Sequence, residues 1–124
     1  MTRLTIRIDF DETRQIGHGK VKLLEMIDRH GSIASAARAM GMSYRRAWLL
    51  TDEVNKMFQE PVIEKKLGGK GGGLASLTMF GRGLVQIYRA IELESLALMS
   101  AKIADLERRL ASDLAPARAG KISN

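Results

Sequence analysis

The sequence predicts a mainly α-helical fold with one small β-hairpin. Three stretches carry this prediction. Residues 31–50 hold two short helical patterns separated by a glycine, residues 61–78 hold two short extended segments around a glycine run, and residues 84–114 hold neither glycine nor proline. Apolar side chains at three- and four-residue intervals indicate helices, and short runs bounded by glycine indicate strands. At 124 residues, we expect one domain with an extended appendage.

Residues 31–50 are predicted to form two helices joined by a tight turn. Ser32 and Ser43 are the expected caps, because a serine hydroxyl accepts a bond from a free backbone N–H in the first turn. Gly41 supplies the left-handed residue that ends the first helix. Two interpretations fit: a helix-turn-helix that presents its second helix to DNA, or an ordinary αα-hairpin. In both, the residues predicted to face the core are Ile33, Ala36, Ala37, Met40, Ala47 and Leu50.

The net charge of +6 is concentrated in residues 18–91, which hold twelve basic and six acidic residues. The flanking stretches, 1–17 and 92–124, each hold equal numbers of both signs. A basic surplus on one module is typical of nucleic-acid-binding proteins, although many solvated surfaces are also basic. The charge distribution therefore favours the DNA-reading interpretation.

The chain has no cysteine and two histidines, His18 and His30. Disulfides, thiolate metal sites and cysteine nucleophiles are therefore excluded. We expect no metal or catalytic site at His30, and no serine triad or other catalytic spacing is visible. The amino-terminus lacks the pattern of a signal peptide or a membrane span, so a cytoplasmic, nucleoid-associated protein is expected.

Residues 3–10 alternate apolar and polar side chains, which predicts a strand with one buried face. Such a strand needs a partner. Residues 11–19 are polar and glycine-containing, and a loop is expected there. Residues 20–30 are predicted to form the first helix, ended by Gly31. The apolar face of the strand consists of Leu4, Ile6, Ile8 and Phe10, and that of the helix includes Val21, Leu24 and Ile27.

The third helix is predicted over residues 43–59, with Arg45 opposite the core-facing stripe. Arginine pairs with guanine or phosphate, and tyrosine and serine hydroxyls commonly contact phosphates. For Arg45 and Arg46 the alternative is a solvated face. Trp48 lies on the flank, and its spacing leaves open both a half-buried packing position and a DNA contact.

Residues 61–67 and 74–78 are predicted to form a hairpin around residues 68–73, which are five glycines and Lys70. A nucleotide-binding loop needs serine or threonine after the lysine and a helix after the loop, and neither follows Lys70. A cationic hairpin tip suits a wing that approaches the DNA backbone. The alternative is a surface loop without a specific role.

A long helix is predicted over residues 80–114, capped by Thr78. The spacing slips near residues 92–95, where we expect a bend, a break or a change of partner. The distal stripe has coiled-coil spacing and is expected to pack against a second copy. The proximal stripe is Leu84, Ile87 and Ile91, and the distal stripe is Met99, Ile103, Leu106 and Leu110.

The predicted order of strand, three helices, hairpin and long helix is that of a winged helix-turn-helix. Residues 1–78 are the expected DNA-binding domain, with the wing at residues 61–78. Residues 79–114 are the expected dimerisation helix, and residues 115–124 the expected flexible tail.

Three motifs resemble the amino-terminal DNA-binding domain of the ModE-type molybdate-responsive regulators. They are Gly-Lys-Val-Lys-Leu-Leu at 19–24, Gly-Ser-Ile-Ala-Ser-Ala-Ala-Arg-Ala-Met-Gly-Met-Ser-Tyr-Arg-Arg-Ala-Trp at 31–48, and Gly-Gly-Lys-Gly-Gly-Gly at 68–73. The resemblance covers roughly residues 3–92. At 77–81 the chain has Leu-Thr-Met-Phe-Gly where that family usually has proline at the third position.

This resemblance implies a dimeric, repressor-like transcriptional regulator with its third helix in the major groove and its wing on the flanking backbone. The family's molybdate-binding β-barrels follow the winged helix, and we expect no such domain and no cofactor in these 124 residues. The alternative is an interaction module that pairs with a full-length regulator. The residues expected to contact DNA are Ser32, Ser35, Ser43, Tyr44, Arg45, Arg46, Trp48 and Lys70.

Overall fold

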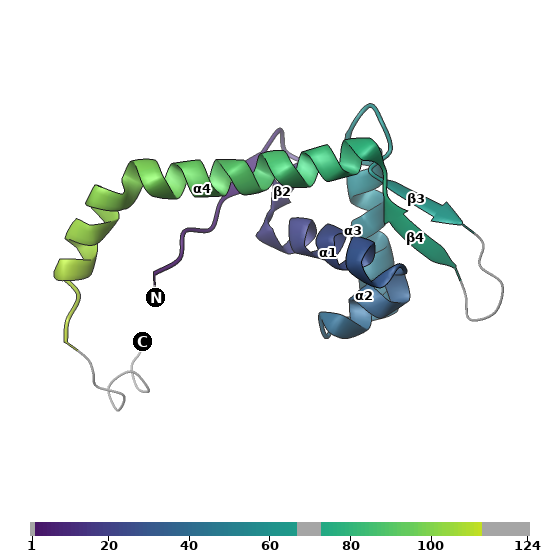
Figure 1. Cartoon of the computed structure of the whole chain (residues 1–124), viewed down its shortest axis with the longest axis horizontal. Helices are drawn as coiled ribbons and strands as arrows, with labels where there is room; N and C mark the ends of the chain where they lie inside the picture. The colour runs from purple at the N-terminus through teal and green to yellow at the C-terminus, as the bar shows by residue number, and fades with distance from the viewer. Residues whose placement is uncertain (1, 67–72, 113–124) are drawn as a thin grey trace. The chain divides into compact units, whose positions relative to one another are not determined.

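The structure, a computed structural model, describes residues 2–66 and 73–112 (Figure 1). The chain divides into two compact units, Met1–Glu92 and Leu93–Asn124. The mainly α-helical class with a small hairpin is confirmed. The elements are β1 (Arg7–Asp9), β2 (Gln15–Gly17), α1 (His18–His30), α2 (Ile33–Ala39), α3 (Tyr44–Met57), β3 (Ile63–Lys66), β4 (Leu74–Leu77) and α4 (Met79–Arg108).

The main core of the first unit lies between α1, α2, α3 and the β3–β4 hairpin. Both predicted serine caps are present: the Ser32 hydroxyl accepts a hydrogen bond from the backbone N–H of Ser35, and that of Ser43 from Arg46. Gly41 has the predicted left-handed conformation, at φ 67°. Of the six predicted core residues, Met40 and Leu50 are only partly buried, and the fully buried ones are Ile33, Ala36, Ala37 and Ala47.

Thr51 is a buried position that the sequence pattern did not predict. Its hydroxyl donates to the carbonyl of Ala47 one turn earlier, at 2.7 Å. Because this bond satisfies the hydroxyl within the helix, threonine can be buried at little cost. The inward face of α3 is therefore formed by Ala47, Thr51, Val54 and Met57.

The amino-terminal strand is shorter than predicted, and the sequence pattern did not predict its partner strand, β2. β1 covers three residues and pairs antiparallel with β2, where a loop was expected, with Ile8 opposite Ile16. The β2 segment is a single buried isoleucine between glutamine and glycine, too short to show an alternating pattern. Phe10, expected on the buried face, is exposed and contacts Phe58 edge to face.

The β3–β4 hairpin is anchored at its root to the helices. The side-chain oxygen of Asn55 on α3 accepts hydrogen bonds from the backbone N–H groups of Val62 and Ile63, at 2.7 and 2.9 Å. The N–H of Ala75 on β4 donates to the carbonyl of Gly31, at 2.8 Å. The root of the hairpin is thereby fixed on the helix-turn-helix.

Thr78 caps α4 as predicted, accepting from the N–H of Gly81 at 2.9 Å. The inward face was predicted only in part: Leu84 packs against both cores, but Ile87 is 63% exposed, whereas Tyr88 is 1% exposed and joins a second small core with Ile16 and Val21. The tyrosine hydroxyl donates to the carbonyl of Ile6. The helix faces this way because Gly81 lies directly against the backbone of the segment before β3.

The second unit contains the end of α4, which stays helical through residues 92–95. No interruption occurs there, although the boundary between the two units falls at this point. Met99 and Ile103 are partly buried within this unit, whereas Leu93, Leu98, Leu106 and Leu110 are exposed.

Two predictions fall outside the described residues: the glycine loop with Lys70, and the tail at residues 115–124. Within residues 2–66 and 73–112, no helix combines the length and hydrophobicity that crossing a lipid bilayer requires.

Candidate nucleic-acid interface

The first turn of α3 presents three polar side chains away from the core. Ser43 caps the helix, and Tyr44, Arg45 and Arg46 are all exposed, Tyr44 at 55%. The buried stripe begins only at Ala47, so these three side chains lie outside the core of the described residues. An exposed arginine at this position can reach base edges or phosphates.

The start of α2 brings two further hydroxyls to the same helix-turn-helix. The Ser32 hydroxyl accepts the capping bond, and a hydroxyl used as an acceptor keeps its proton for a second partner. The hydroxyl of Ser35 accepts from the guanidinium of Arg38, at 3.1 Å. Ser35 therefore serves at least partly to orient that arginine.

Trp48 lies between the helix and the hairpin, 38% exposed. The ammonium nitrogen of Lys65 on β3 lies 4.9 Å from the centre of its indole ring. A cation at this distance over an indole is attracted by the negative face of the ring. Trp48 is therefore neither a core residue nor fully solvated, because it forms one wall of a hollow between α3 and the hairpin.

The sequence pattern did not single out Lys65, Lys66 and Leu74, which line this hollow together with Trp48. The register explains Lys65: it follows Ile63 by two residues, so both lie on the helix-facing side of the hairpin. The sequence signal that could have identified Lys65 is its position two residues after a core-facing isoleucine.

Basic side chains divide into two groups according to their partners. Within the first unit, several are paired with carboxylates, among them Lys20 with Glu53 and Arg82 with Asp28. In the part of that unit that the structure describes, the basic side chains with no carboxylate within 4.0 Å are Arg3, Lys22, Arg29, Arg38, Arg45, Arg46, Lys65 and Lys66.

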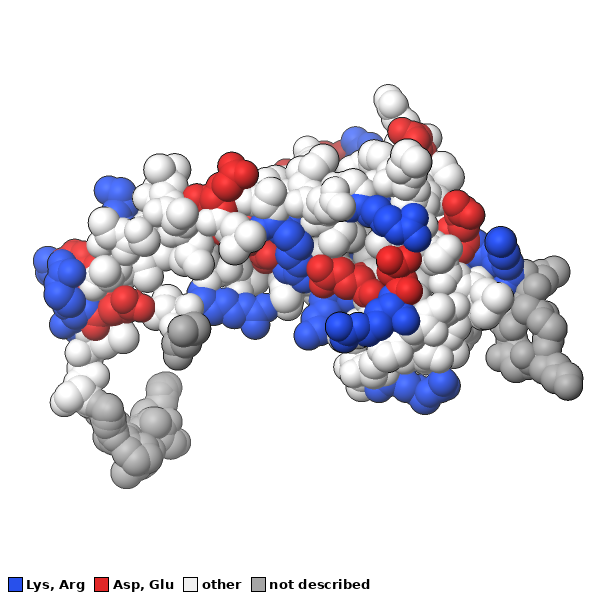
Figure 2. Space-filling model, viewed as in Figure 1, with Lys and Arg blue, Asp and Glu red and all other residues white. Residues whose placement is uncertain are grey.

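The unpaired group is concentrated on the helix-turn-helix and the hairpin: one lies on α2, two on α3 and two on β3. In Figure 2, acidic and basic side chains lie next to one another over the middle of the first unit, whereas blue alone appears along its lower edge, opposite α4. Positive charge that no carboxylate neutralises remains available for an anionic partner.

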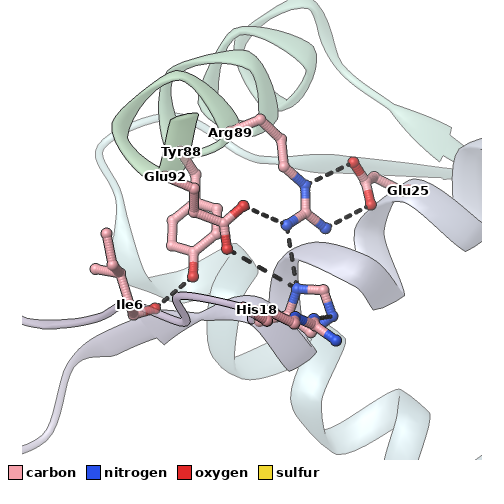
Figure 3. Close-up of polar contacts among 7 residues, drawn as sticks. Ile6, His18, Glu25, Tyr88, Arg89 and Glu92 are labelled. Carbon is pink, nitrogen blue, oxygen red and sulfur yellow. Dashed lines mark hydrogen bonds and ion pairs between the residues drawn. The ribbon is translucent and has the colours of Figure 1, made fainter. Parts of the chain in front are cut away.

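A polar cluster holds α4 against α1 and the amino-terminal segment (Figure 3). The guanidinium of Arg89 makes two hydrogen bonds to Glu25, at 2.8 and 3.0 Å, and one to Glu92, at 2.7 Å. This pairing raises the pKa of Arg89 and lowers that of Glu25. Because its charges satisfy one another, the cluster stabilises the fold and offers little attraction to DNA.

His18 belongs to this cluster and faces Arg89 (Figure 3). One of its ring nitrogens lies 3.1 Å from the guanidinium of Arg89, and the other lies 2.6 Å from that of Arg3. Burial and the two guanidinium groups lower its pKa. No group of three or more His, Asp or Glu side chains in the described ranges is arranged to hold a metal ion.

Comparison with known proteins gives three informative relatives. The chain is 39% identical over 87 residues to "Molybdenum transport protein ModE" of Azotobacter vinelandii, which covers 70% of this chain and 32% of that protein. It is 40% identical over 78 residues to "Molybdenum-pterin-binding protein MopA" of Rhodobacter capsulatus, covering 63% and 29%. It is 41% identical over 69 residues to "DNA-binding transcriptional dual regulator ModE" of Escherichia coli K12, covering 56% and 26%.

The chain thus spans about a third of the length of the curated relatives it matches. No protein-family model matches the sequence. Most of each relative therefore has no counterpart in these 124 residues.

Proposed function

We propose, from the premise that this chain carries the winged helix-turn-helix of the ModE-type regulators, that it is a sequence-specific DNA-binding transcriptional regulator. In this proposal α3 enters the major groove with Tyr44, Arg45 and Arg46 toward the bases. The β3–β4 hairpin lies over the flanking backbone, with Lys70 at its tip. The protein acts as a homodimer and represses transcription by occupying its operator.

The observation that carries the proposal is the location of the unpaired cations. Five of the eight unpaired cations, Arg38, Arg45, Arg46, Lys65 and Lys66, lie on α2, α3 and the hairpin, whereas several basic residues elsewhere on the unit, such as Lys20 and Arg89, are neutralised by carboxylates. A phosphate backbone attracts the first group and gains little from the second. The relative named as a DNA-binding regulator supports the same conclusion.

Selection of bound duplexes from a random pool by the purified protein tests the proposal. We expect a two-fold symmetric site, as two copies reading half-sites would require. On that site, Arg45→Ala combined with Arg46→Ala should weaken binding at least about tenfold, because one bidentate base contact is worth roughly 1–3 kcal/mol. Fluorescence anisotropy of the labelled duplex measures the change.

The matched control replaces two other adjacent arginines, Arg108 and Arg109, which pair with Asp105 outside the winged unit. Alanine at both of these positions should leave the affinity unchanged. Equal binding by the Arg45/Arg46 variant and the parent would refute the assignment of α3 as the reading helix.

A second candidate function is that of an interaction module which pairs with a longer relative and modulates it. The exposed leucines of the second unit support it, because they suit any partner helix. Obligate co-purification with a longer relative, without DNA binding by the protein alone, would favour this function over the first. Neither function involves catalysis.

A further inference from the structure

We propose that the hollow between α3 and the β3–β4 hairpin seats one deoxyribose-phosphate unit of a DNA strand. Trp48 and Leu74 would lie against the sugar, and Lys65 beside the phosphate. This inference rests on the proposed function and deepens it, because it assigns a backbone contact to residues outside the first turn of α3.

The hollow has a volume of about 420 Å³ and combines two kinds of lining. Two apolar side chains border it from different sides: Trp48 on α3 is 38% exposed, and Leu74 on β4, which pairs with Lys66, is 57% exposed. The rim is cationic and polar, with Lys65, Lys66 and the hydroxyl of Ser32. Exposed apolar side chains gathered beside uncompensated cations indicate a partner that is itself apolar and anionic.

Lys65 is held in place without being neutralised. Its position on the helix-facing side of the hairpin brings its ammonium over the indole of Trp48, at 4.9 Å from the ring centre. A carboxylate partner would cancel the charge, whereas an aromatic ring orients the cation and leaves it positive. The ammonium group of Lys65 therefore keeps its positive charge and can bind an anion at the edge of the hollow.

The strand of a DNA duplex has the matching chemistry. Its bases are stacked inside, so a protein surface between two groove contacts meets alternating phosphates and the C–H faces of sugars. If α3 occupies the major groove and the hairpin lies on the flank, the intervening strand passes over the hollow that separates them. The hydroxyl of Ser32, which caps α2 as an acceptor, can donate its proton to the same phosphate.

The first experiment measures binding of a labelled mixed-sequence duplex across a range of salt concentrations, because a backbone contact does not depend on sequence. Leu74→Ser should weaken binding by about five- to tenfold at every salt concentration, as expected for the loss of a partly buried leucine contact. Lys65→Gln should weaken binding most at low salt and reduce the slope of log affinity against log salt by about 0.9, the value for one phosphate.

Two control variants match these in chemistry. Met79→Ser removes an exposed apolar side chain at the hairpin root, outside the hollow. Lys56→Gln removes an exposed lysine that pairs with Asp52 near the end of α3. Both should bind the duplex as the parent does, and all four variants replace exposed side chains, so circular dichroism should give the parent's spectrum.

The second experiment uses Trp48 itself, the only tryptophan in the chain. Saturation with the duplex should reduce quenching of its fluorescence by acrylamide at least about twofold, because the sugar covers the indole face. Unchanged quenching, or a Leu74→Ser variant that binds the duplex as tightly as the parent, would refute the proposed sugar-phosphate site while leaving the proposed function intact. If the parent protein binds no duplex at low salt, both the proposed function and the proposed sugar-phosphate site are refuted.

Discussion

His18 lies where protonation is disfavoured. A guanidinium only donates hydrogen bonds, and a neutral imidazole has one acceptor nitrogen, so His18 can accept from Arg3 or from Arg89 but not from both. A protonated ring accepts from neither. Glu92, with its carboxylate 3.9 Å from the ring, favours the charged form but is itself paired with Arg89.

The stability of the fold should therefore fall as His18 becomes protonated. Its pKa is lowered from 6.5 in the folded state, chiefly by burial and then by Arg3, Arg89 and Lys22. Between the folded and unfolded pKa values the unfolded state binds more protons, so the free energy of unfolding rises with pH. Urea denaturation should show the free energy of unfolding decreasing as the pH falls below about 7.

His18→Gln should flatten this dependence, because an amide does not titrate in the range. His30→Gln still contains His18 and is expected to keep the parent's slope. Identical pH dependence in the parent and the His18 variant would contradict the assignment.

Residues with local signals were predictable, and those with distant partners were not. The caps at Ser32, Ser43 and Thr78 depend on backbone atoms three residues away, so the sequence pattern indicates them. The buried hydroxyl of Tyr88 is satisfied by a carbonyl 82 residues earlier in the chain. Lys65 faces an indole on another element, and its spacing from Ile63 indicates its side of the hairpin but not this partner. Neither partner can be identified from local spacing.

Helix α4 shows how one glycine sets the orientation of a whole element. A Cβ built on Gly81 would lie 2.2 Å from the carbonyl oxygen of Val62 and 3.2 Å from a methyl group of the same residue. Only a glycine lets the helix backbone approach this closely. With the helix packed in this orientation, Tyr88 faces inward and Ile87 is exposed, so the predicted stripe was wrong at Ile87 but right at Leu84.

Gly81→Ala should lower the free energy of unfolding by about 1–3 kcal/mol or more, because the clash is with backbone. Gly83 provides a control in the same helix, since a Cβ there meets nothing within 4 Å. Gly83→Ala should raise stability by roughly 0.5–1 kcal/mol, the usual gain for alanine over glycine in a helix. Chemical denaturation of both variants measures the two changes in the free energy of unfolding. If Gly81→Ala is no less stable than Gly83→Ala, the packing argument is contradicted.

At the level of the whole molecule, the described chain separates a unit with its own core from a unit whose leucines face solvent. The first unit buries its apolar residues in two clusters. In the second, Leu106 near the end of α4 and Leu110 just beyond it are exposed. The sequence pattern predicts that this stripe packs against a second copy, and exposed leucines at its end suit such a partner.

We expect the protein to sediment as a dimer at micromolar concentration. Leu106→Ser combined with Leu110→Ser should convert it to a monomer, because the seam loses the apolar area that drives helix pairing. Lys102→Gln, which changes an exposed residue of the same unit, should leave the mass unchanged. A monomeric parent would rule out the homodimer in the proposed function.

The first turn of α3 carries one further consequence. Tyr44, Arg45 and Arg46 lie between a serine cap and the first buried alanine, and none of them contributes to either core. If these residues read bases as proposed, exchanging them would alter which bases are preferred with little cost in folding, because all three are exposed. Operator preference would then be able to change independently of the core, and duplicated copies would diverge toward new promoters through a few surface substitutions.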